Sequence, residues 1–429
     1  MNVLWVCNQC VPQIAGKLNI PGSNKEGWVA GLFDAVTAKK SEFTLAIAFP
    51  YEENKDFTES DPVAFGFAED TTHPEVYDEK VTERLKEIID NFRPDVVHVF
   101  GTEYGHTLSA ARAVNDPSKL LIGFQGVCEA LAAAYLTGVD EKWITKTTLR
   151  DSLKEDNLKR QQEKFLIRAQ HEKEAVENAG FLAGRTRLDS EYSKRHNPSA
   201  EYVVLNETIR ATFYSGEWEK EKAVPHRIFV SQCDYPIKGF HVMIKALAEL
   251  KKKYPDTHIH VAGNTITGVG GIKKKILIST YGRYLKHLMK ETGTEEAITF
   301  LGQIDAGRMK EEFLSCSVFV LPSVMENSPN CLGEAMLLGT PCVASNVGGV
   351  ADILSPERDG ILYEDNDPQK LSSAIASVFE DEEAGGQRTK TFSVNSREDA
   401  RIKHNAKTNA DALMKIYETM VQRQDEKAK

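Results

Sequence analysis

The sequence of 429 residues lacks a long apolar run, a surplus of basic residues and a paired set of cysteines. No apolar stretch approaches the roughly 18 residues of a transmembrane helix, so a membrane-spanning protein is not expected. Lys and Arg number 53 against 63 Asp and Glu, and this net charge of −10 argues against nucleic acid as the main partner. The seven cysteines are scattered and odd in number, as is typical of reduced thiols in a cytoplasm.

Three short signals are also missing. No GxGxxG follows the first predicted strand, so a dinucleotide-binding domain of the dehydrogenase kind is not supported. Cys7 and Cys10 form a CxxC, but no second pair follows at zinc spacing, and chance explains the motif better than a metal or redox site. Residues 1–7 lack a basic segment and are too short an apolar run for a signal peptide, so we expect a buried strand there.

The sequence does contain two series of alternating strand and helix patterns. In the first half, apolar runs predict strands at 2–6, 43–49, 96–99, 120–124, 180–183 and 202–205. In the second half, they predict strands at 228–231, 258–262, 299–301, 318–321, 342–344 and 361–363. Such alternation is typical of α/β folds with a doubly wound parallel sheet. Because a chain of this length is too long for one core, the sequence predicts two such domains.

Composition sets the expected domain bounds. The predicted domains are 1–215 and 228–396, joined by a charged, proline-containing linker at 216–227 and followed by a final helix at 397–429, which is expected to cross back to the first domain. Before that helix, residues 381–395 are interpreted as polar and irregular. Residues 142–175 predict one long helix, in which alternating basic and acidic side chains favour a solvated surface over a membrane face.

The most informative stretch is residues 322–336, PSVMENSPNCLGEAM, which follows the predicted strand at 318–321. We expect Ser328 to cap a short helix and Pro329 to take its first position, where no N–H is needed. Gly339 is expected to end the helix, because glycine tolerates the left-handed conformation of a C-terminal cap.

Two carboxylates flank the start of this helix. Glu326 lies in the loop after the strand, and Glu334 lies within the helix. The backbone N–H groups of Asn330 and Cys331 point out of the helix start, where the helix dipole favours an anion. A sugar nucleotide suits this arrangement, since it offers a diphosphate together with ribose and sugar hydroxyls. On spacing alone, an ordinary strand–helix unit with two solvated glutamates is the better interpretation.

A second loop of this kind opens the second domain. Lys238 lies between the predicted strand at 228–231 and a helix that starts near Phe240. A positive side chain and the positive end of a helix therefore converge on any bound anion. Because ligands of doubly wound sheets bind beyond the carboxyl ends of the strands, Lys238 and the pair Glu326 and Glu334 can open onto the same edge.

At these positions the chain resembles glycosyltransferase family 4, which has the GT-B fold of two doubly wound, Rossmann-like domains facing across a cleft. The resemblance rests on Lys238-Gly239, Phe300-Leu301-Gly302, Leu321-Pro322-Ser323, the pair Glu326 and Glu334, Glu334-Ala335-Met336, Gly339-Thr340-Pro341 and Gly348-Gly349. Their order and spacing cover roughly the second half of the chain. The first half resembles the family only in layout.

The resemblance implies a role for each of these residues. Lys238 would neutralise the diphosphate and Glu326 would contact the donor sugar, so these two are the expected catalytic residues. Glu334 would hold the ribose hydroxyls. The expected donor-binding residues are Glu334, Gly239, Asn327, Ser328, Pro329, Asn330 and Cys331.

On the acceptor or sugar side, the expected residues are Gly27, His106, Gln125 and Arg210. The chain departs from the family pattern at two places. Cys233 stands where the family usually has an Arg about five residues before the Lys, and Gln125 stands where many members have a His. Arg210 is a candidate to replace the missing positive charge, and His106 is a candidate to replace the missing imidazole.

The resemblance implies a cytoplasmic, retaining hexosyltransferase that needs no metal or other cofactor. It would move a hexose or N-acetylhexosamine from a nucleotide diphosphate sugar, with UDP favoured, to a saccharide. The acceptor is expected to include lipid-linked saccharides of surface polysaccharide biosynthesis. In that case the protein would contact the inner face of the membrane peripherally. Asp365-Asn366-Asp367 is interpreted as a solvated turn rather than a metal site. A nucleotide-sugar epimerase on the same fold and a catalytically silent partner protein remain alternatives, and the base, sugar, acceptor, linkage and oligomeric state stay open.

Overall fold

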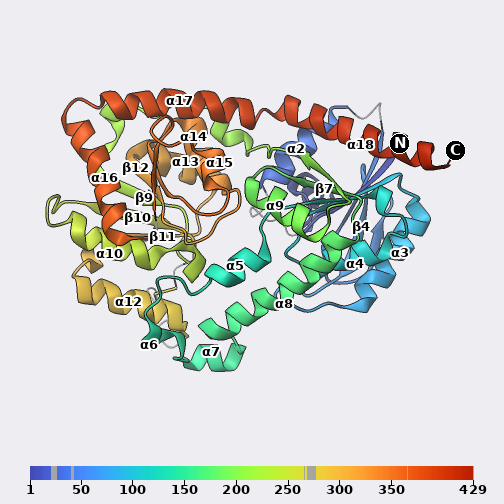
Figure 1. The fold of residues 1–429 in the computed structure, drawn as a ribbon, viewed down its shortest axis with the longest axis horizontal. Helices are drawn as coiled ribbons and strands as arrows, with labels where there is room; N and C mark the ends of the chain where they lie inside the picture. Colours follow the sequence, from blue (N-terminus) through green and yellow to red (C-terminus); the bar gives the residue numbers. More distant parts are fainter. Residues whose placement is uncertain (21–26, 40–42, 265, 268–276, 365, 429) are drawn as a thin grey trace. The chain divides into compact units, whose positions relative to one another are not determined.

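The computed structural model describes residues 1–20, 27–39, 43–264, 266–267, 277–364 and 366–428. The chain forms two compact units, each with one β-sheet covered by helices (Figure 1). Unit 1 contains Met1–Glu129, Lys164–Arg210 and Lys403–Lys429. Unit 2 contains Ala130–Glu163 and Ala211–Ile402.

Unit 1 is built on an eight-stranded sheet with the order β3-β4-β2-β1-β5-β6-β7-β8. Its strands are β1 (Asn2–Val6), β2 (Thr44–Tyr51), β3 (Lys55–Phe57), β4 (Val63–Ala68), β5 (Val96–Phe100), β6 (Leu120–Gly123), β7 (Phe181–Gly184) and β8 (Glu201–Val204). All neighbours are parallel except β3 and β4. The six strands predicted for this half are confirmed. Strands β3 and β4 were not predicted, because no helix separates them from β2 and the alternating pattern is therefore missing.

The helices of unit 1 lie around this sheet (Figure 1). They include α1 (Pro12–Leu18), α2 (Gly27–Thr37), α3 (Glu79–Phe92), α4 (Gly105–Ala113), α9 (Arg187–His196) and α18 (Ala406–Ala428). Apolar side chains of α1, α2 and α18 share one core with strands β1, β2 and β5. The last helix of the chain is therefore part of the first unit's core.

Tyr417 anchors α18 in that core. Its hydroxyl accepts a hydrogen bond from Trp5 Nε1 on β1 at 2.9 Å and lies 2.7 Å from His98 Nδ1 on β5. All three side chains are fully buried. Burial lowers the pKa of His98 to about 3, so its ring is neutral, and Nδ1 can accept a hydrogen bond from the hydroxyl of Tyr417.

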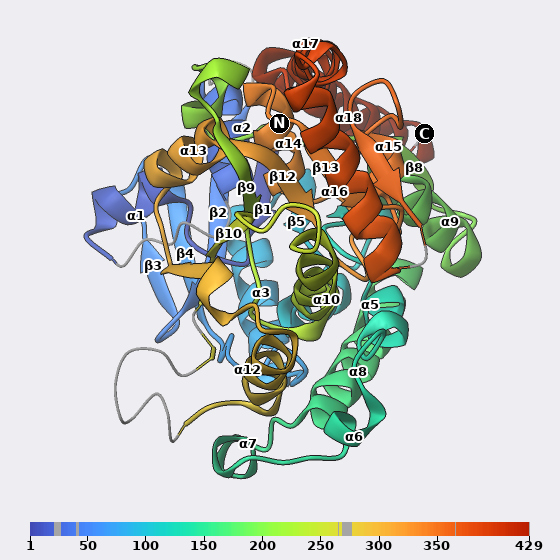
Figure 2. The same ribbon diagram turned by 90° about the vertical axis from the view of Figure 1, so that its left-hand side faces the viewer.

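Unit 2 is built on a six-stranded parallel sheet with the order β11-β10-β9-β12-β13-β14. Its strands are β9 (Val224–Val230), β10 (His258–Ala262), β11 (Ile298–Gly302), β12 (Cys316–Leu321), β13 (Cys342–Ser345) and β14 (Ile361–Tyr363), which confirms the six predicted strands. The helices around it include α10 (Phe240–Leu250), α12 (Thr280–Thr292), α13 (Ala306–Ser315), α14 (Asn330–Leu338), α15 (Val350–Ile353), α16 (Pro368–Glu383) and α17 (Gln387–Lys403) (Figure 2).

The predicted linker at 216–227 is part of unit 2 rather than a free connection. Trp218 is buried, and its Nε1 donates a hydrogen bond to the carbonyl of Cys316 at 2.8 Å. Strand β9 begins at Val224, still within the predicted linker. The first two residues of this strand, Val224 and Pro225, are exposed, and the next two, His226 and Arg227, are polar, so the apolar pattern reveals only its inner end.

The predicted irregular segment at 381–395 is helical. Helix α16 ends at Glu383, and α17 begins at Gln387. The buried face of α17 is formed largely by small and polar residues, which leaves no apolar periodicity to detect: Thr389, Phe392, Ser393, Ser396 and Ala400. The predicted single helix at 397–429 is broken at His404, whose Nδ1–H donates to the carbonyl of Glu207 at 2.8 Å, and α18 continues in unit 1.

Residues 130–163 belong to unit 2 although they lie in the first half of the sequence, so the predicted first domain at 1–215 does not coincide with unit 1. The predicted long helix at 142–175 is three helices, α6 (Glu141–Ile144), α7 (Leu149–Lys154) and α8 (Leu158–Glu177). Helices α6 and α12 lie side by side (Figures 1 and 2). The buried Asp151 of α7 accepts hydrogen bonds from the N–H of Thr280 at 2.8 Å and from its hydroxyl at 2.5 Å, at the start of α12.

Replacing Tyr417 by Phe tests how α18 is held in unit 1. The substitution leaves the indole N–H of Trp5 without its partner in the core, and a buried unpaired donor costs about 1–3 kcal/mol. We expect the free energy of unfolding, measured by denaturant titration, to fall by about that amount. Tyr77→Phe is the control, since the half-buried Tyr77 hydroxyl is bonded to the exposed Glu79 and to the hydroxyl of Thr82, and its loss should cost less than that of the Tyr417 hydroxyl. Equal losses in the two variants would contradict the anchoring role.

Candidate functional site

Each sheet reverses its strand order once, and ligands of doubly wound sheets bind beyond the carboxyl ends of the strands at such a reversal. In unit 2 the reversal lies between β9 and β12, and in unit 1 between β1 and β5. The loop after β9 carries Lys238, and the loop after β12 carries Glu326. The topology of unit 2 therefore places both expected catalytic residues at the reversal.

The loops after β9 and β12 lie in backbone contact. The N–H of Val324 donates to the carbonyl of Ile237 at 2.8 Å. Gly239 has a φ of +64°, and a Cβ at this position would lie 1.8 Å from the carbonyl oxygen of Pro322. Only glycine allows this approach, which gives a geometric reason for the Lys-Gly pair.

Lys238 and Glu326 form an ion pair in this structure. Lys238 Nζ lies 2.7 Å from Glu326 Oε1, and the hydroxyl of Ser323 donates to the same oxygen at 2.7 Å. The two charged side chains are 17% and 11% exposed, respectively. Burial alone would lower the pKa of Lys238, but the carboxylate of Glu326 holds it above its usual range. Lys238 is therefore a cation at neutral pH.

A glycine pair fixes the backbone of Glu326 from the other side. Gly348 has a φ of +53°, and a Cβ there would lie 1.9 Å from the carbonyl oxygen of Glu326. The N–H of Gly349 donates to the same carbonyl at 3.1 Å. Gly348-Gly349, which the resemblance singled out without a role, thus positions the loop that carries the carboxylate.

Helix α14 (Asn330–Leu338) begins differently from the sequence prediction. Pro329 is its N-terminal cap residue rather than its first helical residue, and no side chain caps it, so Ser328 does not have the predicted role. Proline suits this position because its N–H is absent and its φ is fixed. The N–H groups of Asn330 and Cys331 precede the first hydrogen bond within the helix, as expected.

Three polar groups of this segment are enclosed. Glu334 is 4% exposed and Asn327 is 5% exposed. Asn330 Oδ1 is a buried acceptor that has no hydrogen-bond partner among the described residues. Burial raises the pKa of Cys331 to about 12, so its thiol adds no charge beside Lys238 at neutral pH. The helix ends at Gly339 with a φ of +76°, which confirms the predicted left-handed cap.

Cys233, which stands in place of the family's arginine, is a buried thiol. Its Sγ faces the carbonyl of Asn264 at 3.9 Å, and burial raises its pKa, so it supplies no charge. The candidate replacement, Arg210, belongs to unit 1. There its side chain covers Gly27, since a Cβ at Gly27 would lie 2.2 Å from Arg210 Cδ. These two predicted acceptor-side residues are therefore in contact, and the charge role of Arg210 stays a prediction.

In unit 1, four polar side chains at the carboxyl ends of the strands are linked in series. His106 Nδ1–H donates to Glu69 Oε2 at 2.6 Å, and His106 Nε2 lies 2.9 Å from Asn8 Oδ1. Asn8 Nδ2 in turn donates to Gln125 Oε1 at 3.3 Å. His106 and Asn8 are almost fully buried. The two predicted acceptor-side residues, His106 and Gln125, thus meet through Asn8.

Sequence reasoning missed Asn8 and Glu69. Asn8 follows β1 at the reversal of strand order, but that order is visible only in the folded sheet. Glu69 follows the unpredicted β4. One signal was present, since Gly101 has a φ of +94° and a Cβ there would lie 2.8 Å from Asn8 Nδ2. A glycine directly after the strand at 96–99 was therefore a sign that another loop approaches closely.

The described ranges contain neither a metal-binding cluster nor a membrane-spanning helix. Within them, no group of three or more His, Cys, Asp and Glu residues could hold a metal ion. Asp367 instead caps α16 by accepting the N–H of Gln369 at 2.7 Å, while Asp365 lies outside the described residues. Over the same ranges, no helix is both long and apolar enough to cross a membrane.

Comparisons with known proteins locate a family match in the second half of the chain. Residues 213–399 match the family model described as "Glycosyl transferases group 1". The D-inositol 3-phosphate glycosyltransferase of Paenarthrobacter aurescens is 31% identical over 146 residues, which cover 34% of this chain and 33% of that protein. The glycogen synthase of Mycobacterium tuberculosis is 26% identical over 216 residues, which cover 50% of this chain and 49% of that protein. The matched regions thus span about a third to a half of these relatives.

Solved structures match nearly the whole chain. A sucrose-phosphate synthase from Thermosynechococcus elongatus has a TM-score of 0.70 at 16% identity, over 99% of this chain and 100% of that one. The Anabaena protein HepE in complex with UDP has a TM-score of 0.64 at 15% identity, over 98% and 100%, and HepE has also been solved with UDP-glucose. At these identities the likeness shows the fold. The chain therefore has the GT-B fold of two Rossmann-like α/β units, and its residues 213–399 match the model of the glycosyl transferases group 1 family.

Proposed function

We propose that this protein is a retaining, metal-independent glycosyltransferase that moves a hexose or N-acetylhexosamine from a UDP-sugar to a saccharide. The observation that carries the proposal is the ion pair of Lys238 with Glu326 at the reversal of strand order, directly before α14. The family match over 213–399 supports glycosyl transfer. The UDP and UDP-glucose bound by HepE, whose fold is similar, support a UDP-sugar as the donor.

Unit 2 has the groups that a nucleotide diphosphate needs. The start of α14 offers the N–H groups of Asn330 and Cys331 and the positive end of the helix dipole, which together attract a diphosphate. Lys238 adds a full positive charge. Glu334 lies further along the same helix and offers a carboxylate to the ribose hydroxyls, while the buried Asn330 Oδ1 offers a further acceptor.

The ion pair also accounts for the chemistry. Breaking the bond between the anomeric carbon and the phosphate oxygen leaves negative charge on the diphosphate, and preorganised donors aimed at that charge are the main catalytic resource. A bound diphosphate competes with Glu326 for the ammonium of Lys238. The released carboxylate then accepts hydrogen bonds from the donor sugar. Lys238 and the helix start thus do the work that a metal ion does in other enzymes.

The acceptor is proposed to bind unit 1 near His106, Gln125, Gly27 and Arg210. A saccharide, including a lipid-linked one of surface polysaccharide biosynthesis at the inner face of the membrane, is the acceptor class we propose. The buried, uncharged Cys233 is the observation that favours the alternative of a catalytically silent partner protein, because one cation is missing from the expected set. Donor binding distinguishes the two.

Thermal unfolding with UDP, GDP, ADP and their sugar conjugates, in the absence of metal, tests the donor. A ligand at 100 times its dissociation constant adds about 2.7 kcal/mol to stability, and we expect the UDP series alone to do so. Glu334→Ala should abolish this stabilisation, whereas Glu296→Ala, at an exposed position of the same unit, should keep it. Unchanged UDP affinity in Glu334→Ala would reject the ribose role. Absence of any stabilisation in the native protein would favour the silent partner.

Replacing Lys238 by Met tests the cation at the diphosphate. We expect turnover to fall by roughly 100- to 1000-fold, since loss of one preorganised donor typically costs that much, with a smaller change in UDP affinity. Glu326 loses its partner in this variant, so the unfolding curve must be recorded beside the rate. Adding Glu326→Gln removes the unpaired charge and should restore stability but not turnover. A near-native rate in either variant would assign the role to another group.

Chelation tests the proposed independence from metal. Turnover should be the same within about twofold in excess EDTA and in millimolar Mg²⁺ or Mn²⁺, because Lys238 and the start of α14 supply the positive potential. The measurement is the initial rate of UDP release with and without chelator. Loss of activity in EDTA that returns with Mg²⁺ or Mn²⁺ would show that the mechanism needs a metal.

A further inference from the structure

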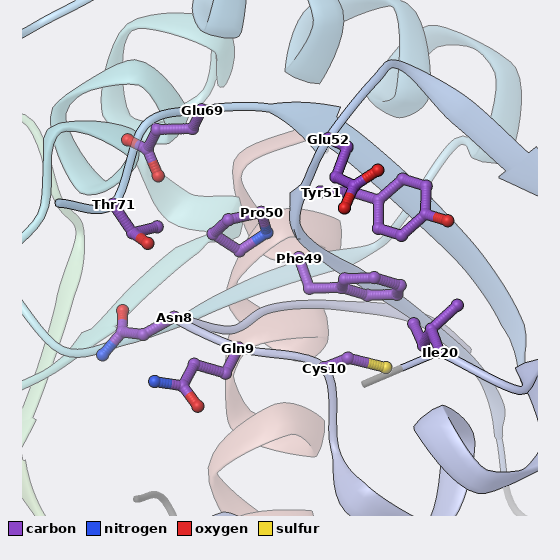
Figure 3. A pocket seen from close by; sticks show the side chains of 10 residues that line it. All are labelled: Asn8, Gln9, Cys10, Ile20, Phe49, Pro50, Tyr51, Glu52, Glu69 and Thr71. Atoms are coloured by element: carbon purple, nitrogen blue, oxygen red, sulfur yellow. The ribbon is translucent and has the colours of Figure 1, made fainter. Parts of the chain in front are cut away.

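Unit 1 contains a cavity of about 330 Å³ at the carboxyl ends of β1, β2 and β4 (Figure 3). It is lined by Asn8, Gln9, Cys10, Ile20, Phe49, Pro50, Tyr51, Glu52, Glu69 and Thr71. Asn8 and Glu69 are also the two hydrogen-bond partners of His106. The cavity is therefore continuous with the buried polar series described above, although none of the acceptor-side residues predicted from the sequence lines it.

The lining combines an apolar side with a polar side. In Figure 3, Phe49, Tyr51 and Ile20 lie on the right, with Glu52 beside Tyr51, whereas Asn8, Glu69 and Thr71 lie on the left. An aromatic and aliphatic wall suits the apolar face of a ring, and a few placed polar groups fix its orientation. A polyhydroxylated ring matches both sides.

Several polar atoms of the cavity are hydrogen-bond acceptors. Glu52 and Glu69 present carboxylates, which accept only when ionised. Gln9 Oε1 is a buried acceptor with no hydrogen-bond partner among the described residues. Such groups are satisfied by a ligand that brings O–H donors.

The charge of the lining has one sign. Two of the ten lining residues are glutamates, and none of these ten is Lys or Arg. Glu69 is held in place by His106, and its side chain is 9% exposed, whereas Glu52 is exposed at the rim. Burial raises the pKa of the Cys10 thiol to about 12, so it adds no charge of its own. A phosphate in this cavity would face two carboxylates without a counter-charge from the lining, which is costly.

We propose that this cavity binds an uncharged saccharide unit of the acceptor, and that Glu52 and Glu69 exclude phosphorylated acceptors. Its place in a transfer reaction rests on the proposed function, but the binding itself does not. Two similar proteins are named for phosphorylated compounds, a D-inositol 3-phosphate glycosyltransferase and a sucrose-phosphate synthase. The negative lining of this cavity predicts a different acceptor for this chain.

Binding of matched sugar pairs to the full chain tests the proposal without any donor. The probes are myo-inositol with inositol 3-phosphate, fructose with fructose 6-phosphate, and glucose with glucose 6-phosphate, measured by titration with ligand-observed NMR. We expect at least one neutral sugar to bind, about tenfold or more tighter than its phosphorylated partner. Raising the ionic strength from 0.05 to 0.5 M should narrow this ratio, since salt screens the repulsion.

Charge-neutral variants assign the selectivity to the two carboxylates. In the double variant Glu52→Gln/Glu69→Gln, the ratio of the dissociation constant of the phosphorylated sugar to that of its neutral partner should fall about tenfold, which corresponds to 1.4 kcal/mol. Glu53→Gln is the matched control, because Glu53 adjoins Glu52 in sequence but does not line the cavity, and its ratio should stay within about twofold of the native value. If an unfolding curve shows that Glu69→Gln is unfolded, Glu52→Gln alone, at its exposed position, should still lower the ratio about threefold.

Three outcomes would overturn the proposal. They are a phosphorylated sugar that binds as tightly as its neutral partner, no binding by any probe, and a ratio that changes as much in Glu53→Gln as in the double variant. Failure of the proposed function is a separate result. If the protein binds neutral sugars with this selectivity but is not stabilised by UDP, the proposed saccharide site stands and the proposed transferase function is rejected.

Discussion

A parallel sheet whose strand order reverses once brings the loops after its two central strands together, and both sheets of this chain are built in this way. In unit 2 the reversal brings Lys238 within 2.7 Å of Glu326, 88 residues away. In unit 1 it brings Asn8 within 2.9 Å of His106, 98 residues away. Burying a charged or polar side chain is costly unless it has a partner. The topology that brings these residues together therefore also reduces the cost of burying them.

The pair in unit 2 depends on backbone contacts as much as on charge. Gly239 and Gly348 leave no room for a Cβ, and they hold the loops on either side of Glu326 closely enough for the pair to form. With a neutral, buried thiol at Cys233, Lys238 is the cation that the loop after β9 provides. A buried pair of this kind contributes little net stability, because desolvation offsets the attraction between the charges. On the proposed function, the pair holds Lys238 and Glu326 in place before the donor binds.

The candidate site of unit 2 contains a cation, Lys238, beside its carboxylates, whereas the ten residues that line the cavity of unit 1 include two glutamates and no Lys or Arg. Unit 2 presents Lys238 and the start of α14, which suit an anionic donor. The cavity of unit 1 presents Glu52 and Glu69, which suit an uncharged, hydroxyl-bearing ligand and disfavour a phosphate. On the proposals made above, this difference keeps the nucleotide diphosphate out of the saccharide cavity. Residues 213–399 carry the family match, whereas the cavity lies in the first half of the chain, so on these proposals the acceptor differs from those of the similar proteins.

The sequence by itself determined the α/β class and twelve of the fourteen strands of the described chain, because apolar runs are local signals, and it named Lys238, Glu326 and Glu334 as candidates for the unit 2 site. Local signals failed at β4, where no helix intervenes, and at α17, whose buried face carries Thr389, Ser393 and Ser396. Only the tertiary structure assigned residues 130–163 to unit 2. Only it joined Glu69 and Asn8 to His106. These are contacts between residues far apart in the chain, and they follow from strand order, which no local pattern encodes.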